Sequence, residues 1–173
     1  KYSVLIIQPW LNYRGAETLS YQLAEDLSAS GVEARIVSLY VSDYVQNWVK
    51  YRFVILPNKL IQRVMKNQFM FLLGGIFSLL YLVMRYGKSF SVLNPHNFPT
   101  VWVAVIASRF LKKPVVWTVH NFPQHPFRGL LGWLYELVIN PIDRYFVKKV
   151  DLVVAVSEKV AKEVYEKYGV TGS

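Results

Sequence analysis

Six short apolar runs recur along the chain, and helical patterns lie between most of them. The runs cover residues 4–7, 33–39, 53–56, 90–93, 115–119 and 152–156. Each is nearly continuous in apolar character, which is typical of strands that helices cover on both faces. Strands that alternate with helices predict a parallel sheet with right-handed crossovers. We therefore expect an α/β fold, a Rossmann-like doubly wound parallel sheet in three layers.

The first of these runs leads into a turn that contains glycine. A loop is expected over residues 8–13, after which Arg14 and Gly15 open a helix that Gly31 ends. Backbone N–H groups at such a strand-to-helix turn can face an anion. Gly15 permits a ligand to approach the backbone closely, and Arg14 adds a fixed cation. This turn is the first candidate binding element.

The length and composition predict a single domain over residues 1–173. A chain of 173 residues can bury a sizeable core, and its 53% hydrophobic and 16% aromatic content argues against disorder. The sequence holds no cysteine, which excludes disulfides and thiolate metal sites and fits a reducing cytosol. The apolar run at residues 4–7 is too short for a secretory signal. We therefore expect a cytoplasmic protein.

The net charge of +9 is concentrated in the middle of the chain. From Tyr44 to Tyr135 there is no Asp or Glu, yet this stretch holds eleven Lys and Arg residues. A field of one sign attracts anions such as phosphates, acidic lipids or nucleic acid. The simpler interpretation is a basic solvated face that has no partner.

Two stretches are unusually apolar. Residues 69–84 carry no charge, but sixteen residues fall short of the ~20 that span a bilayer, and Gly74-Gly75 interrupts them. Residues 126–149 combine Trp and Phe with basic side chains. Both stretches are compatible with helices packed against a sheet. Both are also compatible with interfacial helices that dip into a membrane surface.

Three loops are expected to meet at the carboxyl edge of the sheet. If the strand order is 3-2-1-4-5-6, the loops over residues 13–17, 94–98 and 120–125 converge on one crevice, where such sheets bind ligands. His96 and His120 end neighbouring strands there and could bind a phosphate or take a proton from a hydroxyl. The alternative for each is a loop residue hydrogen-bonded to the backbone. His125 is more typical of a turn.

Other site types lack support in the sequence. The histidines lie on separate loops without a nearby carboxylate, so no metal site is predicted. No Gly-x-Ser-x-Gly elbow, Gly-x-Gly-x-x-Gly fingerprint or Walker phosphate loop occurs. Ser157 is expected to cap the last helix, which Gly169 ends.

Three motifs together resemble the N-terminal half of a GT-B glycosyltransferase of the retaining family 4. Residues 14–17, Arg-Gly-Ala-Glu, are similar to the family's Gly-Gly-Ala-Glu turn, although Arg14 replaces the first glycine. Residues 115–121, Val-Val-Trp-Thr-Val-His-Asn, resemble the strand that ends in a histidine near the acceptor. Residues 151–158, Asp-Leu-Val-Val-Ala-Val-Ser-Glu, resemble the last strand of that half and the serine after it.

The resemblance implies transfer of a sugar from a nucleotide-sugar to an acceptor hydroxyl, with retention at the anomeric carbon. No cofactor or obligatory metal is implied. His120 would be the catalytic residue, near the acceptor and the donor sugar, and Gly15 would lie on the donor phosphate side or at the floor of the cleft. The remaining substrate contacts would be Arg14, His96, Asn121 and Ser157.

In this family the C-terminal half holds most of the nucleotide-sugar. The chain ends where that half would begin, so we expect an excised acceptor-side domain or one chain of a two-chain enzyme, inactive alone. The basic, apolar middle fits a lipid-phosphate acceptor and a peripheral position on an anionic membrane, at its inner face. The alternatives are a non-catalytic module that docks on a membrane or partner, and half of a sugar-nucleotide epimerase. Nucleic acid is not a predicted partner, because the bases form no recognisable motif.

Overall fold

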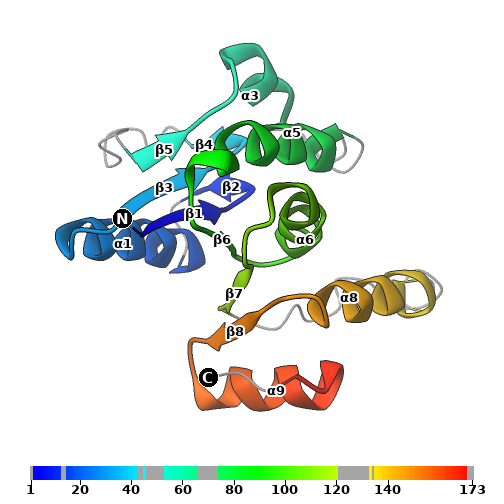
Figure 1. The fold of residues 1–173 in the computed structure, drawn as a ribbon. Helices are drawn as coiled ribbons and strands as arrows, with labels where there is room; N and C mark the ends of the chain where they lie inside the picture. Colours follow the sequence, from blue (N-terminus) through cyan, green and yellow to red (C-terminus); the bar gives the residue numbers. More distant parts are fainter. Residues whose placement is uncertain are drawn as a thin grey trace.

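The computed structural model describes residues 2–12, 15–42, 45, 53–65, 74–120, 133 and 135–170. Figure 1 shows how the elements are arranged. The strands are β1 (Ser3–Ile7), β2 (Trp10–Leu11), β3 (Glu33–Val37), β4 (Tyr40–Val41), β5 (Val54–Ile55), β6 (Val92–Pro95), β7 (Val116–Val119) and β8 (Leu152–Ala155). The helices are α1 (Gly15–Ala29), α3 (Lys59–Met65), α5 (Ile76–Tyr86), α6 (Thr100–Leu111), α8 (Asn140–Val147) and α9 (Glu158–Tyr168), with a 3₁₀ turn (Gly87–Ser89) and a π-helical turn (Tyr135–Ile139).

The main sheet is parallel and has the strand order that the sequence analysis assumed. Four strands pair as β5-β3-β1-β6, and β7 pairs with β8. Two bridges, Leu93 with Val115 and His96 with Thr118, join β6 to β7. The six predicted strands therefore stand in the order 3-2-1-4-5-6, which places the ends of β1, β6 and β7 side by side. The prediction of a doubly wound α/β sheet is confirmed.

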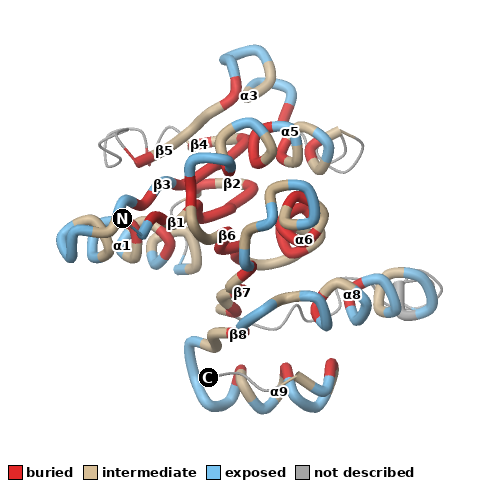
Figure 2. The backbone as a smooth tube through the Cα atoms, in the orientation of Figure 1, coloured by how far each residue is buried: buried red, intermediate tan, exposed pale blue. Residues whose placement is uncertain are grey.

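Helices cover both faces of this sheet, because successive side chains of a strand point to opposite sides. Ile6 packs in one cluster with Ala24 of α1. Leu5 and Ile7 pack in the other, with Leu79 of α5 and residues of α6. Figure 1 shows α1 on one side of β1 and α6 on the other, and Figure 2 shows buried strands between helices whose outer surfaces are exposed. The predicted three layers are present.

The fourth strand begins later than the sequence predicts. A strand was expected over residues 90–93, but β6 covers Val92–Pro95. Asn94 pairs with Ile6, and Pro95 pairs with Ile7. Asn and Pro are disfavoured in strands, yet the register with β1 overrides that local preference. This shift carries Asn94 into the sheet and His96 to its edge.

Two short strands replace part of the loop expected over residues 8–13. Trp10–Leu11 forms β2, which pairs in parallel with β4, Tyr40–Val41. The Leu39 N–H donates to the Pro9 carbonyl at 3.1 Å, and the Ser42 N–H donates to the Leu11 carbonyl at 2.9 Å. Two-residue strands leave no periodic pattern for sequence analysis to detect. They extend the chain beyond the carboxyl ends of β1 and β3.

The predicted ends of the first and last helices are confirmed. Gly31 has φ of +80°, a left-handed conformation that glycine adopts without steric cost. Ser157 caps α9, and its Oγ accepts a hydrogen bond from the Val160 N–H at 3.3 Å. Gly169 follows α9 with φ of +69°.

The described part of the first apolar stretch is an amphipathic helix. Leu79, Leu82 and Val83 of α5 are buried, whereas Phe77 is 73% exposed and Tyr81 is 60% exposed. One face is therefore a covered core face, and the other presents aromatic side chains to solvent. Residues 69–73, and residues 126–132 of the second stretch, lie outside the described part. Within it, no helix combines the length and apolar character needed to cross a bilayer.

Candidate active site

The structure brings His96 and His120 into direct contact at the carboxyl edge of the sheet. His96 follows β6 and His120 follows β7. The Nε2 of His120 lies 2.7 Å from the Nδ1 of His96, and the ring centroids are 4.7 Å apart. We refer to these two residues as the histidine pair. Their contact requires that β6 and β7 be neighbours, which the strand order provides.

The first turns of α1 lie against the histidine pair. The Oγ of Ser20 is 2.8 Å from the Nδ1 of His96 and donates to the Ala16 carbonyl at 2.9 Å. Ala16 follows Gly15, so the glycine turn and the histidine pair lie on the same side of the sheet. A Cβ added at Gly15 would meet no described atom within 4 Å, so packing does not require glycine there. The open space leaves the backbone accessible to a ligand.

Asn94 supports the histidine pair from inside the sheet. Its Oδ1 lies 2.7 Å from the Nε2 of His96. Its Nδ2 donates to the Val116 carbonyl and, at 2.9 Å, to the Oγ1 of Thr118. The sequence analysis did not single out Asn94, Thr118 or Ser20. A signal was present, because Asn94/His96 and Thr118/His120 are two apart and share a strand face.

Burial keeps the histidine pair neutral. His96 has no exposed surface. Desolvation, with a smaller contribution from a charge on His120, lowers the pKa of His96 to about 3. Desolvation also lowers the pKa of the half-buried His120. Each ring is therefore a neutral imidazole near pH 7, with one donor nitrogen and one acceptor nitrogen.

Two buried polar atoms near this edge lack partners among the described residues. One is the Nδ1 of His120, and the other is the Oε1 of Gln8, a residue that is 1% exposed. Gln8 directly follows β1, two strands from β7. Buried polar atoms without a hydrogen bond are uncommon, so each of these two atoms is expected to have a partner outside the described residues. The sequence analysis placed Gln8 in a loop and missed it.

Of the other residues considered in the sequence analysis, Ser157 and His96 belong to the described part of the chain. Ser157 follows β8, next to β7, where it caps α9. His96 is enclosed, with both ring nitrogens occupied by neighbours, so this geometry favours support of His120 over direct contact with substrate. Arg14, Asn121 and His125 lie outside the described residues. In the described part, no three His, Asp or Glu residues group as metal ligands, and the absence of a metal site stays a prediction.

Comparison with known proteins gives the family. The family model described as Glycosyltransferase Family 4 matches residues 13–173. The chain belongs to glycosyltransferase family 4. This match covers the glycine turn and both members of the histidine pair. Among curated protein sequences, the comparison finds no match for the family 4 chain.

Solved glycosyltransferases share the fold. HepE from Anabaena, solved with UDP and glucose, has a TM-score of 0.68 at 14% identity, over 100% of this chain and 42% of that one. A glycosyltransferase from Rickettsia africae has a TM-score of 0.56 at 19% identity, over 98% of this chain and 40% of that one. An α-glucosyltransferase in complex with UDP has a TM-score of 0.55 at 12% identity, over 99% and 40%. The chain thus spans about 40% of the length of these proteins. The Rossmann-like GT-B fold prediction is confirmed.

Proposed function

We propose that this chain is the acceptor-side half of a retaining glycosyltransferase that moves a sugar from a UDP-sugar to an acceptor hydroxyl. Membership of family 4 supports sugar transfer, and similar structures were solved with UDP or with UDP and glucose. The observation that carries the proposal is the Nδ1 of His120, a buried atom at the carboxyl edge of the sheet that has no partner among the described residues.

In this proposal His120 orients a hydroxyl group. Because burial lowers its pKa, His120 is a weak base, but its neutral ring can still accept a hydrogen bond. A sugar hydroxyl that donates to Nδ1 would be fixed beside the histidine pair. Holding the reacting groups in a productive geometry removes part of the entropic barrier to transfer.

The start of α1 is the proposed neighbour of the donor diphosphate. The first N–H groups of a helix have no partner within the helix, and its dipole favours a negative charge there. Gly15 begins α1, and no described atom lies within 4 Å of the position that a Cβ on Gly15 would occupy. We propose that the diphosphate binds next to the start of α1 and that Arg14 is an additional, less important phosphate contact.

The donor-binding half is proposed to come from a further domain or a partner chain. The chain spans about 42% of HepE, the similar protein solved with UDP and glucose. We therefore expect residues 1–173 alone to be inactive. A co-substrate nucleotide-sugar, and no resident cofactor, completes the proposed reaction.

The test is a transfer assay on the full-length protein, meaning residues 1–173 together with the proposed donor-binding half, beside residues 1–173 alone. UDP release from a panel of UDP-sugars should depend on an added acceptor and occur only with the full-length protein. NMR of the new glycosidic bond should show retention. Isomerisation of the UDP-sugar without an acceptor would instead identify an epimerase. Failure to bind or turn over any nucleotide-sugar would reject the proposal.

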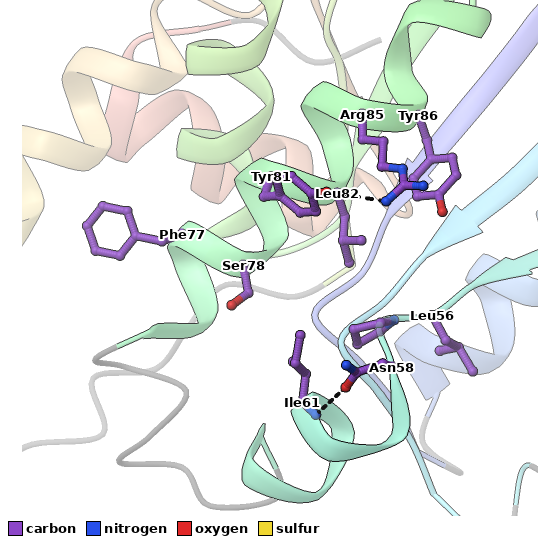
Figure 3. A pocket seen from close by; sticks show the side chains of 10 residues that line it. Leu56, Asn58, Ile61, Phe77, Ser78, Tyr81, Leu82, Arg85 and Tyr86 are labelled. Carbon is purple, nitrogen blue, oxygen red and sulfur yellow. Dashed lines mark hydrogen bonds between the residues drawn. The ribbon is translucent and has the colours of Figure 1, made fainter.

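A cavity between α3 and α5 favours a lipid-linked acceptor. It has a volume of about 530 Å³, and Figure 3 shows Ile61 of α3 and Phe77, Tyr81 and Arg85 of α5 around it. The Arg85 guanidinium donates to the Tyr81 hydroxyl at 3.3 Å. Apolar walls beside a cation suit an amphipathic anion. Residues 56–58 of its lining directly follow β5, whereas Arg85 and Tyr86 end α5 shortly before β6 begins, so the cavity extends along α5 from the carboxyl edge of the sheet toward the opposite edge.

We propose that this face lies on an anionic membrane, at the inner surface of the cell membrane. Lys59, Arg63 and Arg85 are exposed on α3 and α5, and no acidic residue occurs from Tyr44 to Tyr135. Attraction to acidic lipids combined with partial insertion of aromatic side chains is how peripheral helices bind membranes.

Liposome co-sedimentation tests this position. The full-length protein should bind vesicles rich in phosphatidylglycerol at low salt and dissociate at high salt. Replacing Phe77 by Ser should weaken binding about tenfold, because one inserted aromatic side chain is lost. The matched control is Phe110→Ser on α6, since Phe110 is 71% exposed and Phe77 is 73% exposed. No binding at low salt, or equal effects of the two variants, would contradict the membrane position.

A further inference from the structure

We propose that Asn94 and His96 are positioning residues that hold His120 in the tautomer with an unprotonated Nδ1. They do so through a directed chain of hydrogen bonds that runs from the centre of the sheet to its carboxyl edge. The inference rests on the proposed function, because it concerns how His120 receives a substrate hydroxyl. It assigns a role to two polar side chains, Asn94 and His96, that the reaction itself does not require to touch substrate.

The chain begins at Asn94, whose amide orientation is set by the neighbouring strand. The Val116 carbonyl can only accept, so the group of Asn94 that faces it must be the NH₂. That NH₂ also reaches the Thr118 Oγ1 at 2.9 Å. The Oδ1 of Asn94 must then face His96 Nε2, at 2.7 Å. Because Oδ1 can only accept, Nε2 of His96 carries the proton.

The second link passes this constraint to His120. Neutral His96 with a proton on Nε2 has a lone pair on Nδ1. The Nε2 of His120 lies 2.7 Å from that Nδ1, a distance at which two facing lone pairs would repel each other. His120 must therefore donate through Nε2–H. A neutral imidazole carries a single ring proton, so the Nδ1 of His120 is left as an acceptor.

The environment of the chain keeps it in this direction. Asn94 is 4% exposed and His96 is fully buried, so water does not compete for these hydrogen bonds. The Ser20 Oγ lies 2.9 Å from the Ala16 carbonyl and 2.8 Å from the unprotonated Nδ1 of His96, so its hydroxyl can donate to either acceptor and does not determine which nitrogen of His96 is protonated. A hydroxyl that reaches the Nδ1 of His120 must therefore donate its hydrogen bond to that atom. This donation fixes the direction in which the lone pairs of the hydroxyl oxygen point.

The test compares two replacements of His96 in the full-length protein. An Asn at position 96 keeps an oxygen near the place of Nδ1, which can still accept from His120, whereas a Leu of similar size removes that acceptor. With ¹⁵N-labelled histidine, NMR should show a protonated Nε2 and a bare Nδ1 for His120 in the wild type and in His96→Asn. In His96→Leu the two tautomers of His120 should mix. Transfer from a UDP-sugar should fall at least about tenfold in His96→Leu, chiefly in kcat, and recover in His96→Asn, because the loss of a tautomer-setting group lowers turnover.

Ser20→Ala is the matched control for the origin of the tautomer, and it should leave the His120 signals unchanged. The NMR measurement decides the proposal even if His96→Leu folds poorly, since the wild type alone must show Nε2–H on His120. A proton on Nδ1 in the wild type, or a change of tautomer in Ser20→Ala, would overturn the positioning chain. If the tautomers behave as stated while no UDP-sugar is transferred, the proposed function is wrong and the positioning role falls with it.

Discussion

Replacing His120 by Ala is expected to lower the turnover of sugar transfer by about a hundredfold or more, while the domain stays folded. The substitution removes the Nδ1 atom, which has no partner among the described residues and is proposed to receive the hydroxyl, and misplacement of a reacting group can cost about 10²-fold. His120 is only half-buried, so the fold should tolerate the loss. Steady-state kinetics with a UDP-sugar and its acceptor, together with circular dichroism, measure both effects.

Two further variants of His120 identify the nitrogen that matters. In His120→Asn a side-chain oxygen occupies roughly the place of Nδ1, whereas in His120→Gln the amide reaches the place of Nε2. If a hydroxyl binds at Nδ1, the Asn variant should retain more turnover than the Gln variant. Should His120→Ala transfer sugar at a near-normal rate, His120 does not belong to the active site and the reaction takes place elsewhere.

The sequence was sufficient to predict a doubly wound parallel sheet and, with an assumed strand order, the meeting of the two histidines. Short, continuously apolar runs such as residues 4–7 indicate strands that are buried on both faces. The right-handed crossover rule then leaves few ways to connect them. His96 and His120 end the fourth and fifth strands, so the order 3-2-1-4-5-6 makes them neighbours. The apolar pattern of the strands and the right-handed crossover rule together account for this part of the prediction.

The sequence did not predict the register of β6 or the direction of the hydrogen bonds. Asn94 and Pro95 read as a turn, because local preference gives no information about pairing with Ile6 and Ile7. The role of Asn94 depends on the Val116 carbonyl, which belongs to another strand. A backbone atom brought near by tertiary structure leaves no trace in the local sequence. The exposed face of α5 was left open for a similar reason, since periodicity does not reveal which apolar residues are covered.

Acid is expected to destabilise the domain through His96. In the unfolded chain a histidine binds a proton below its ordinary pKa of about 6.5, whereas burial lowers the pKa of folded His96 to about 3. The unfolded state therefore binds more protons in the window between these values. Stability is complete above pH 6.5 and falls as the pH drops toward 3. From pH 7 to 4.5 the free energy of unfolding should fall by on the order of 2–3 kcal/mol from this residue alone.

Urea unfolding of the chain at several pH values measures this loss, with His96→Asn as the reference. Carboxylates titrate in the same acidic range, so the informative quantity is the difference in slope between the wild type and the variant. His120, whose pKa burial also lowers, adds to the slope in both proteins. Ser20 and Asn94, the other polar groups that face His96, do not titrate in this range. Equal slopes for the two proteins would show that His96 takes up its proton in the folded state, and the neutral hydrogen-bond chain that leads to His120 could not persist in acid.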